Sequence, residues 1–231
     1  MATTKTWADF QAQLTLELKA DAARLSSADL DQFIQRAAEL FSAHRPRVVV
    51  ADLPATGAFD YPVPDDWDAD ESIPLKVEFP AGEQVPRFLP DDEWMLYRSA
   101  TGICMLRFLE MIPSLGTIRL TYTIPYILTP TPTPNGSNTL PDSSFMAVIY
   151  KAAQLACEGL AAQYAKTSDP TIAADVVNYR TKSQEFSSRA KDFLTRYEEE
   201  IQKDAARGDI GEWDLMLTGG RPQLFHNPKW R

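Results

Sequence analysis

Residues 142–208 read DSSFMAVIYKAAQLACEGLAAQYAKTSDPTIAADVVNYRTKSQEFSSRAKDFLTRYEEEIQKDAARG. Apolar residues recur in this stretch at intervals of three and four, the spacing of one face of an α-helix. The first stripe comprises Phe145, Ile149, Ala152, Ala156, Leu160 and Tyr164. The second comprises Val176, Tyr179, Phe186, Ala190, Phe193, Leu194, Tyr197 and Ile201. The stretch therefore predicts two long amphipathic helices, over residues 143–166 and 172–206.

The break between these helices reads Thr-Ser-Asp-Pro at residues 167–170. Pro170 cannot continue a helix because it lacks the backbone N–H, whereas Thr171 can cap the next helix, which ends at Gly208. At 1.5 Å per residue the helices would be roughly 35 and 55 Å long. This length favours packing against copies of the same chain, and an antiparallel hairpin within a monomer is the alternative.

The N-terminal residues predict a shorter helical pair. In residues 7–19 the large apolar positions include Phe10, Leu14, Leu16 and Leu18. Three of them are four apart, which favours a helix, although the three leucines also alternate as in a strand. Ser26 or Ser27 can cap a second helix over residues 27–44. Its apolar stripe comprises Leu30, Phe33, Ile34, Ala37, Leu40 and Phe41.

After Pro46 the apolar period changes from helical to alternating, and proline becomes frequent. Alternating runs separated by Gly and Pro turn signals are typical of antiparallel strands. The predicted strands lie at residues 47–51, 59–64, 73–79, 94–98, 103–110 and 117–127. One side of the third is predicted to carry Ile73, Leu75, Val77 and Phe79, and one side of the last Ile118, Leu120, Tyr122 and Ile124.

The sequence thus predicts an α+β fold in five parts. Residues 1–46 and 142–208 form a mainly helical scaffold, and residues 47–128 form an inserted antiparallel β module of five or six strands. Residues 129–141, rich in alternating Thr and Pro, are a linker, with a glycan-bearing or partner-binding segment as the alternative. Residues 209–231 form an extended C-terminal arm.

Charge and hydropathy exclude some classes of function. The formal net charge is -9 and the pI is about 4.8. This balance argues against wrapping nucleic acid, which needs a basic face, but is compatible with a wall past which DNA slides. No run approaches about 18 apolar residues and the first residues lack an apolar signal core, so we expect no membrane span and no signal peptide. Cys104 and Cys157 are predicted to be buried free thiols.

Few residues have the spacing of catalytic or metal sites. The histidines are His44 and His226, and neither lies at ligand spacing from another ligand type. The sequence contains no glycine-rich phosphate loop and no nucleophile elbow. The acidic run at residues 65–71 lacks the glycine and terminal glutamate of an EF-hand, and is predicted to be a solvated loop. We therefore expect a protein that is not an enzyme and needs no metal or cofactor.

The C-terminal arm is too apolar for a solvated tail. Its double glycine at residues 219–220 supplies a hinge, and two later prolines limit the entropy lost on ordering. Basic residues near the end give it a local positive charge. It is predicted to dock on a neighbouring subunit or another protein, with packing on its own domain as the alternative. The partner-binding residues of the arm are predicted to be Trp213, Leu224, Phe225, Trp230 and Arg231.

The order of these features resembles the head-to-tail adaptors, also called connector or head-completion proteins, of tailed bacteriophages. The resemblance lies in SSADLDQFIQRAA at residues 26–38, FDYPVPDDW at residues 59–67, RLTY at residues 119–122, and alanine-rich helices that start after Leu140-Pro141. It extends to about Ile201. The arm from Asp209 onward has no matching motif.

The resemblance implies a structural virion protein that forms a closed ring, a dodecamer, and joins the portal to the tail or neck. Its partners would be other copies of itself, the portal protein and a tail or neck protein, with the long helices side by side around a channel. DNA would pass through that channel without sequence-specific binding, because an acidic wall gains no counterion-release free energy from phosphates. The protein would be made in the host cytoplasm and reside in the virion.

Two other classes of function stay open. An enzyme could place its site in the β module, with carboxylates such as Asp66 and Glu110. A carbohydrate-binding β module on a helical stalk could use Trp67, Trp94 and Tyr97.

Overall fold

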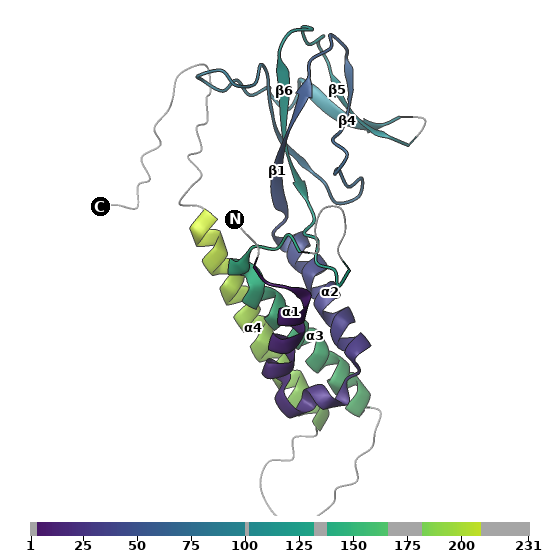
Figure 1. Cartoon of the computed structure of the whole chain (residues 1–231), viewed down its shortest axis with the longest axis vertical. Coiled ribbons are helices and arrows are strands. Elements are labelled where there is room, and N and C mark those ends of the chain that lie inside the picture. Colours follow the sequence, from purple (N-terminus) through teal and green to yellow (C-terminus); the bar gives the residue numbers. More distant parts are fainter. Residues whose placement is uncertain (1–3, 100–101, 132–137, 166–181, 209–231) are drawn as a thin grey trace, which may run out of the picture.

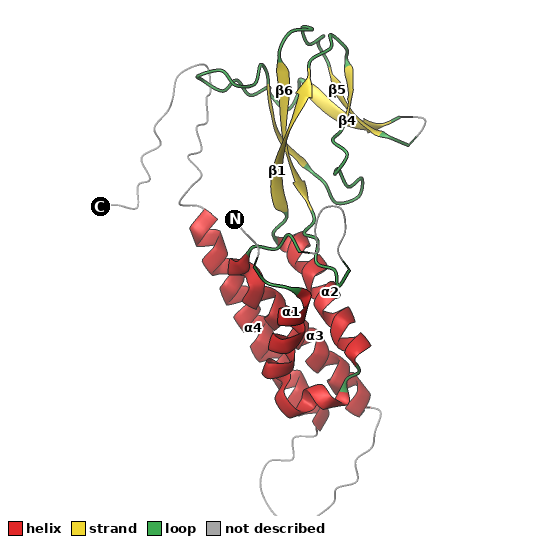
Figure 2. Ribbon diagram, in the orientation of Figure 1, coloured by secondary structure: helices red, strands yellow, loops and turns green. Residues whose placement is uncertain are grey.

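The computed structural model describes residues 4–99, 102–131, 138–165 and 182–208. A bundle of helices and a β module lie end to end along the long axis of the molecule (Figure 1). Helices and strands occupy separate regions (Figure 2), so the α+β class predicted from the sequence is confirmed.

The described part of the bundle contains four α-helices. They are α1 (Trp7–Leu18), α2 (Ser27–His44), α3 (Phe145–Ala165) and α4 (Lys182–Gly208), with the 3-10 helices η1 (Lys19–Arg24) and η2 (Asp142–Ser144). The first three agree with the predicted spans, and α1 is a helix rather than a strand. The predicted break at residues 167–170, the cap Thr171, and Val176 and Tyr179 of the second stripe lie outside the described residues.

Ser26, not Ser27, caps α2. The Ser26 hydroxyl accepts a hydrogen bond from the backbone N–H of Asp29 at 3.1 Å, and the Asp29 carboxylate accepts one from the backbone N–H of Ser26 at 3.0 Å. These reciprocal bonds satisfy two N–H groups at the helix start that no helical carbonyl reaches. Thr6 and Asp9 form the same capping box at α1.

α3 is the central helix, packed against α1, α2 and α4. Four of its alanines are fully buried, Ala147, Ala152, Ala153 and Ala156, and small side chains let the neighbouring helices approach closely. α3 and α4 run antiparallel, since Tyr164 stacks on Phe186 whereas Tyr150 stacks on Phe193. α3 and α4 therefore form an antiparallel pair within one chain, which is the alternative to packing against copies of the same chain. α3 packs against the other helices of its own bundle.

α3 with its leading turn is long and apolar enough, by length and composition, to cross a membrane. In the structure 56% of that window is buried inside the molecule. A core helix that is mostly buried in a folded domain passes the same test of length and composition.

The β module contains two three-stranded antiparallel sheets. Sheet A has the order β1-β6-β3 and sheet B the order β2-β5-β4. The strands are β1 (Arg47–Pro54), β2 (Asp60–Pro62), β3 (Pro74–Glu78), β4 (Trp94–Arg98), β5 (Cys104–Phe108) and β6 (Thr117–Ile124). The predicted antiparallel module of five or six strands is confirmed, with six strands among the described residues.

The module has a core of its own between the two sheets, separate from the core of the bundle. The predicted side of β6 is buried there: Ile118, Leu120, Tyr122 and Ile124. The prediction for the third strand is wrong in part, because Ile73 and Leu75 are 60% and 43% exposed while Val77 and Phe79 are buried. The register with β6 shifts between Pro74 and Lys76, so alternation does not continue through this point.

The two cysteines differ in burial. Cys157 in α3 is buried as predicted, and burial raises the pKa of its thiol to about 11. The prediction is wrong for Cys104, which is only half-buried. Cys104 lies at the hairpin end of β5, paired with Arg98 of the edge strand β4.

Candidate interaction surface

Exposed apolar side chains gather on the β module. Of the thirteen large apolar side chains that are exposed among the described residues, Leu16 in α1 is the one on the bundle. The others are Val48, Val50, Phe59, Ile73, Leu75, Val85, Phe88, Met95, Ile103, Leu109, Met111 and Leu115. Residues 47–128 also carry thirteen Asp and Glu against six Lys and Arg, a net charge of −7. The module therefore combines an apolar surface with most of the net negative charge of the chain, −7 of −9.

One part of this surface is the outer face of sheet A, which points away from sheet B. On β1 the outward side chains include Val48 and Val50, 56% and 58% exposed. Each pairs across the ladder with a threonine of β6, Thr123 and Thr121 respectively. Side chains of directly opposed residues lie on the same face of a sheet. The outer face thus has an apolar strip on β1 beside a row of threonines on β6.

An ion-pair network bounds this strip on the side away from the bundle. The Arg119 guanidinium donates to both oxygens of the Asp52 carboxylate at 2.8 and 3.1 Å, and lies 3.5 Å from the Glu78 carboxylate. These hydrogen bonds hold the pKa of Asp52 below its usual range. Asp52 and Glu78 are therefore already paired and do not offer free charge to a partner.

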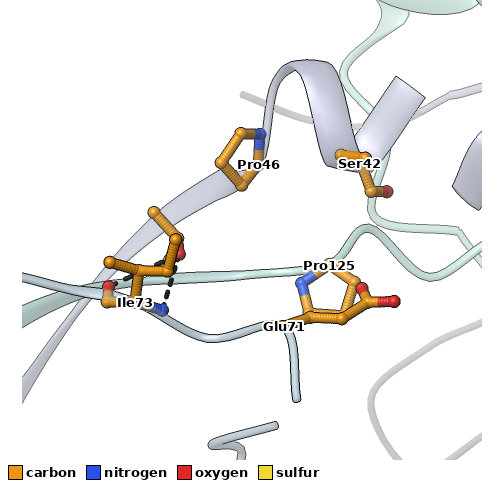
Figure 3. Close-up of a pocket in the computed structure, with 7 residues that line it drawn as sticks. Ser42, Pro46, Glu71, Ile73 and Pro125 are labelled. Carbon is orange, nitrogen blue, oxygen red and sulfur yellow. Dashed lines mark hydrogen bonds between the residues drawn. The ribbon is translucent and has the colours of Figure 1, made fainter. Parts of the chain in front are cut away.

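A pocket of about 220 Å³ bounds the strip on the side of the bundle (Figure 3). We call it the junction pocket, because it lies where α2 meets sheet A. Its lining residues are Ser42, Ala43, Pro46, Glu71, Ile73, Thr123 and Pro125. Thr123 lines the pocket and pairs directly with Val48 across the ladder, so the pocket and the strip are continuous.

Hydrogen bonds hold the walls of the junction pocket together. The Ser42 hydroxyl donates to Ala38 O at 2.8 Å and accepts from the backbone N–H of Tyr126 at 3.0 Å. On the opposite wall, the backbone N–H of Ile73 donates to the Thr123 hydroxyl at 3.0 Å, and the backbone N–H of Thr123 donates to Ile73 O at 2.9 Å. The pocket is thus built from segments that are far apart in the sequence and joined directly.

The chemistry of the junction pocket suits binding. Its lining is apolar at Pro46, Ile73 and Pro125, and Glu71 is the one charged residue in it. Within the described part of the chain, the Glu71 carboxylate makes no ion pair or hydrogen bond. The Ser42 hydroxyl is already hydrogen-bonded to two backbone groups. The pocket can therefore take an apolar side chain next to a cation.

The residues proposed for an enzyme site are not brought together. The Asp66 carboxylate accepts a hydrogen bond from the Tyr122 hydroxyl, which packs in the module core. Glu110 is exposed in the loop after β5. Among the residues that the structure describes, no group of three His, Cys, Asp or Glu could hold a metal ion. In the acidic run, the Asp68 carboxylate accepts from the backbone N–H groups of Asp70 and Glu71, as in a closed turn.

The aromatic residues proposed for carbohydrate binding form no common platform. Trp67 lies against Tyr122 with ring centroids 5.3 Å apart, and Trp94 also packs against the module core. Tyr97 lies beside Arg107 on sheet B. These side chains contribute to packing within the module.

The arm residues Trp213, Leu224, Phe225, Trp230 and Arg231 lie outside the described residues. The sequence did not single out the junction pocket or Val48 and Val50 as a site. The three consecutive valines from 48 to 50 signalled a strand, but the pattern did not show which side would be buried. Only the pairing of β1 with β6 decides that Val49 faces the core.

No protein-family model and no curated protein matches this chain. Among solved structures, it is similar to a chain in the neck of an empty gene transfer agent particle computed with C6 symmetry, at 18% identity, covering 80% of this chain and 92% of that one, with a TM-score of 0.28. A chain in the neck of the native particle, computed with C12 symmetry, is 17% identical over 80% and 94% of the two chains, with a TM-score of 0.28. A chain in the virion of the native particle is 19% identical over 80% and 93%, with a TM-score of 0.27. TM-scores this low do not establish a shared fold.

Proposed function

We propose that this chain is a structural virion protein, a ring-forming head-to-tail adaptor that joins the portal to the tail or neck and continues the DNA channel. The observation that carries the proposal is the order of the elements. A capped helical pair precedes an inserted antiparallel β module, and a long helical pair follows it. The quoted adaptor-like segments fall at the start of α2, at β2 and its loop, in β6 and before α3.

The distribution of apolar surface supports a role in assembly. Contiguous exposed apolar side chains on a folded domain mark contacts with other molecules. The exposed large apolar side chains lie on the module, with Val48 and Val50 side by side on one face of β1, whereas the described surface of the bundle exposes Leu16 alone. Contacts between the long helices of neighbouring copies would then be mostly polar, and the module would supply the apolar contacts.

A closed ring follows if one head-to-tail contact repeats between identical subunits and the rotation closes. The ring order proposed from the resemblance is twelve. The portal protein would lie on one side of the ring, and a tail or neck protein on the other. DNA would pass without sequence-specific binding, because the net charge of -9 disfavours phosphate contacts.

The C-terminal arm would attach the ring to its surroundings. Trp213, Leu224, Phe225, Trp230 and Arg231 would bind the portal or a neighbouring subunit. Aromatic and arginine side chains dominate the energetics of many interfaces, which supports this choice of residues.

Electron microscopy of particles and mass measurement of the purified chain, alone and mixed with portal rings, test the proposal. We expect a closed ring between portal and tail. The Val50→Asp variant should reduce ring formation, while Leu16→Asp, a matched exposed site on the bundle, should not. Particles whose head-to-tail joint contains no ring of this chain would contradict the proposed function.

A further inference from the structure

We propose that the junction pocket receives Trp230 from the C-terminal arm of a neighbouring copy, with Lys229 and Arg231 placed next to Glu71. This inference rests on the proposed ring-forming function and names the contact that joins one subunit to the next. The occupant is residues 209–231 of a second copy of this chain, and the receiving surface is the junction pocket with Val48 and Val50.

The size of the pocket fits one large side chain. At about 220 Å³ it is smaller than the roughly 300–1,000 Å³ of typical small-molecule sites. Its prolines and Ile73 offer the apolar contact that an indole ring needs (Figure 3). The apolar strip of Val48 and Val50 continues from the pocket, where it can cover the arm residues Leu224 and Phe225.

The charges of the acidic run beside the pocket and of residues 215–231 of the arm are opposite. Glu71 ends an acidic run with five carboxylates in residues 65–71, and its own carboxylate has no partner within the described residues. Residues 215–231 contain Arg221, Lys229 and Arg231 and no Asp or Glu. Complementary charge steers association and selects the correct partner surface. Lys229 and Arg231 flank the tryptophan, so both can approach the acidic rim when the ring enters the pocket.

The origin of the arm also suits this contact. The hydroxyl of Tyr197, in the second half of α4, lies 2.6 Å from Nδ1 of His44, which is two residues before Pro46 in the pocket. α4 therefore ends on the module side of the bundle, as Figure 1 shows. The 23 residues that follow Gly208 can span at most about 75 Å when extended.

A neighbouring copy is proposed as the source because, in the proposed ring, each chain must present two different, complementary surfaces to its neighbours. Two such surfaces on one chain form the repeating contact of a ring. On the described surface of the bundle, Leu16 is the one exposed large apolar side chain, so the bundle offers few apolar anchors between copies. A contact between the arm and the junction pocket would supply apolar contact between copies.

Two half-defective variants of the full chain test the contact. Trp230→Ser has an intact pocket and a defective arm, and Val48→Lys/Glu71→Lys has an intact arm and a defective pocket. Both pocket substitutions are at exposed positions, so the fold should be retained, with melting temperature as the check. Alone, each variant should self-associate at least about tenfold more weakly than the wild type, the effect of one interface hot spot. Leu16→Lys, the control on the bundle, should associate like the wild type.

Mixing the two variants gives the decisive result. One arm and one pocket remain complementary, so sedimentation velocity should show a 1:1 heterodimer and no larger ring. In addition, a chain that carries Lys229→Glu and Arg231→Glu should bind a chain that carries Glu71→Lys, because the charges on the two sides of the contact are exchanged. A mixture that stays monomeric overturns the inference, and so does wild-type assembly by Trp230→Ser. If each variant alone loses melting temperature and the mixture forms no heterodimer, the arm occupies the pocket of its own chain.

The proposed function has a separate readout. A monomeric mixture together with rings in particles would overturn the contact between arm and pocket and leave the adaptor role standing. A heterodimer in solution together with particles that lack a ring would support the contact and overturn the adaptor role.

Discussion

Ser26 fixes the start of α2 through its hydroxyl, which accepts the backbone N–H of Asp29. Replacing Ser26 with alanine leaves that N–H without its partner, and loss of an N-cap costs about 1 kcal/mol. We therefore expect Ser26→Ala to lower the free energy of unfolding by about 1 kcal/mol in urea denaturation. Ser27→Ala is the control, because Ser27 is an exposed helical residue that makes no capping bond. Equal losses in both variants would contradict the assignment of the cap.

Asp142 joins the N-terminal segment to the start of η2 and α3. Its carboxylate accepts the Thr4 backbone N–H at 3.0 Å, the Thr4 hydroxyl at 2.5 Å and the Lys5 backbone N–H at 3.3 Å. These hydrogen bonds, first of all those from Thr4, lower the pKa of Asp142 in the folded protein. A carboxylate with a lowered folded pKa stabilises the fold above its unfolded pKa of about 3.9, and the stabilisation is lost as the pH falls through the folded value.

We therefore expect Asp142→Asn to lower the melting temperature at pH 7, and the difference from the wild type to shrink as the pH is lowered below about 4. Thermal melts across this pH range measure the effect. Asp92→Asn, at an exposed position in the loop before β4, should leave the melting curve unchanged at every pH. A constant difference for Asp142→Asn at all pH values would show that its charge is not what matters.

At the scale of one element, α3 depends on small side chains. Ala156 is fully buried between its neighbours, whereas Ala162, farther along the same helix, is exposed. Alanine and leucine have similar helix propensity, so a leucine tests packing rather than helix formation. We expect Ala156→Leu to lower the free energy of unfolding by about 1–3 kcal/mol through overpacking, and Ala162→Leu to have little effect. Chemical denaturation measures both, and a neutral Ala156→Leu would show that the bundle can expand at this point.

The pairing of two strands, β3 and β6, also decides where the junction pocket lies. The register of β3 against β6 shifts between Pro74 and Lys76, and this irregularity leaves Ile73 on the surface. Had alternation continued, Ile73 would face the module core with Val77. The shift therefore turns a predicted core residue into a lining residue of the pocket.

At the scale of the whole molecule, the bundle and the module have separate cores. Leu120 lies in the module core and Leu14 in the bundle core, and both are fully buried. We expect Leu120→Ala to destabilise the module by about 2–5 kcal/mol. Hydrogen exchange should then rise in peptides from β6 and change little in peptides from α3. Leu14→Ala is the reciprocal control, and an equal rise in both regions after either substitution would show that the two parts unfold as one unit.

The sequence by itself determined the element type along most of the described chain. Helical spacing placed α2 at residues 27–44, and alternation placed β6 and its buried side, because backbone periodicity decides which side chains share a face. Prolines at 46 and 141 marked the changes between the two periods. The charge balance also followed from the sequence alone.

Tertiary structure decided which faces are buried and which residues meet. Val49 faces the core while Val48 and Val50 face outward, because β1 pairs with β6 in one register and only one side of that sheet packs on sheet B. Pro46, Glu71 and Pro125 line one pocket although they are far apart in the sequence. Local spacing carries no information on such long-range pairing, which depends on the strand register and on the hydrogen bonds between Ile73 and Thr123.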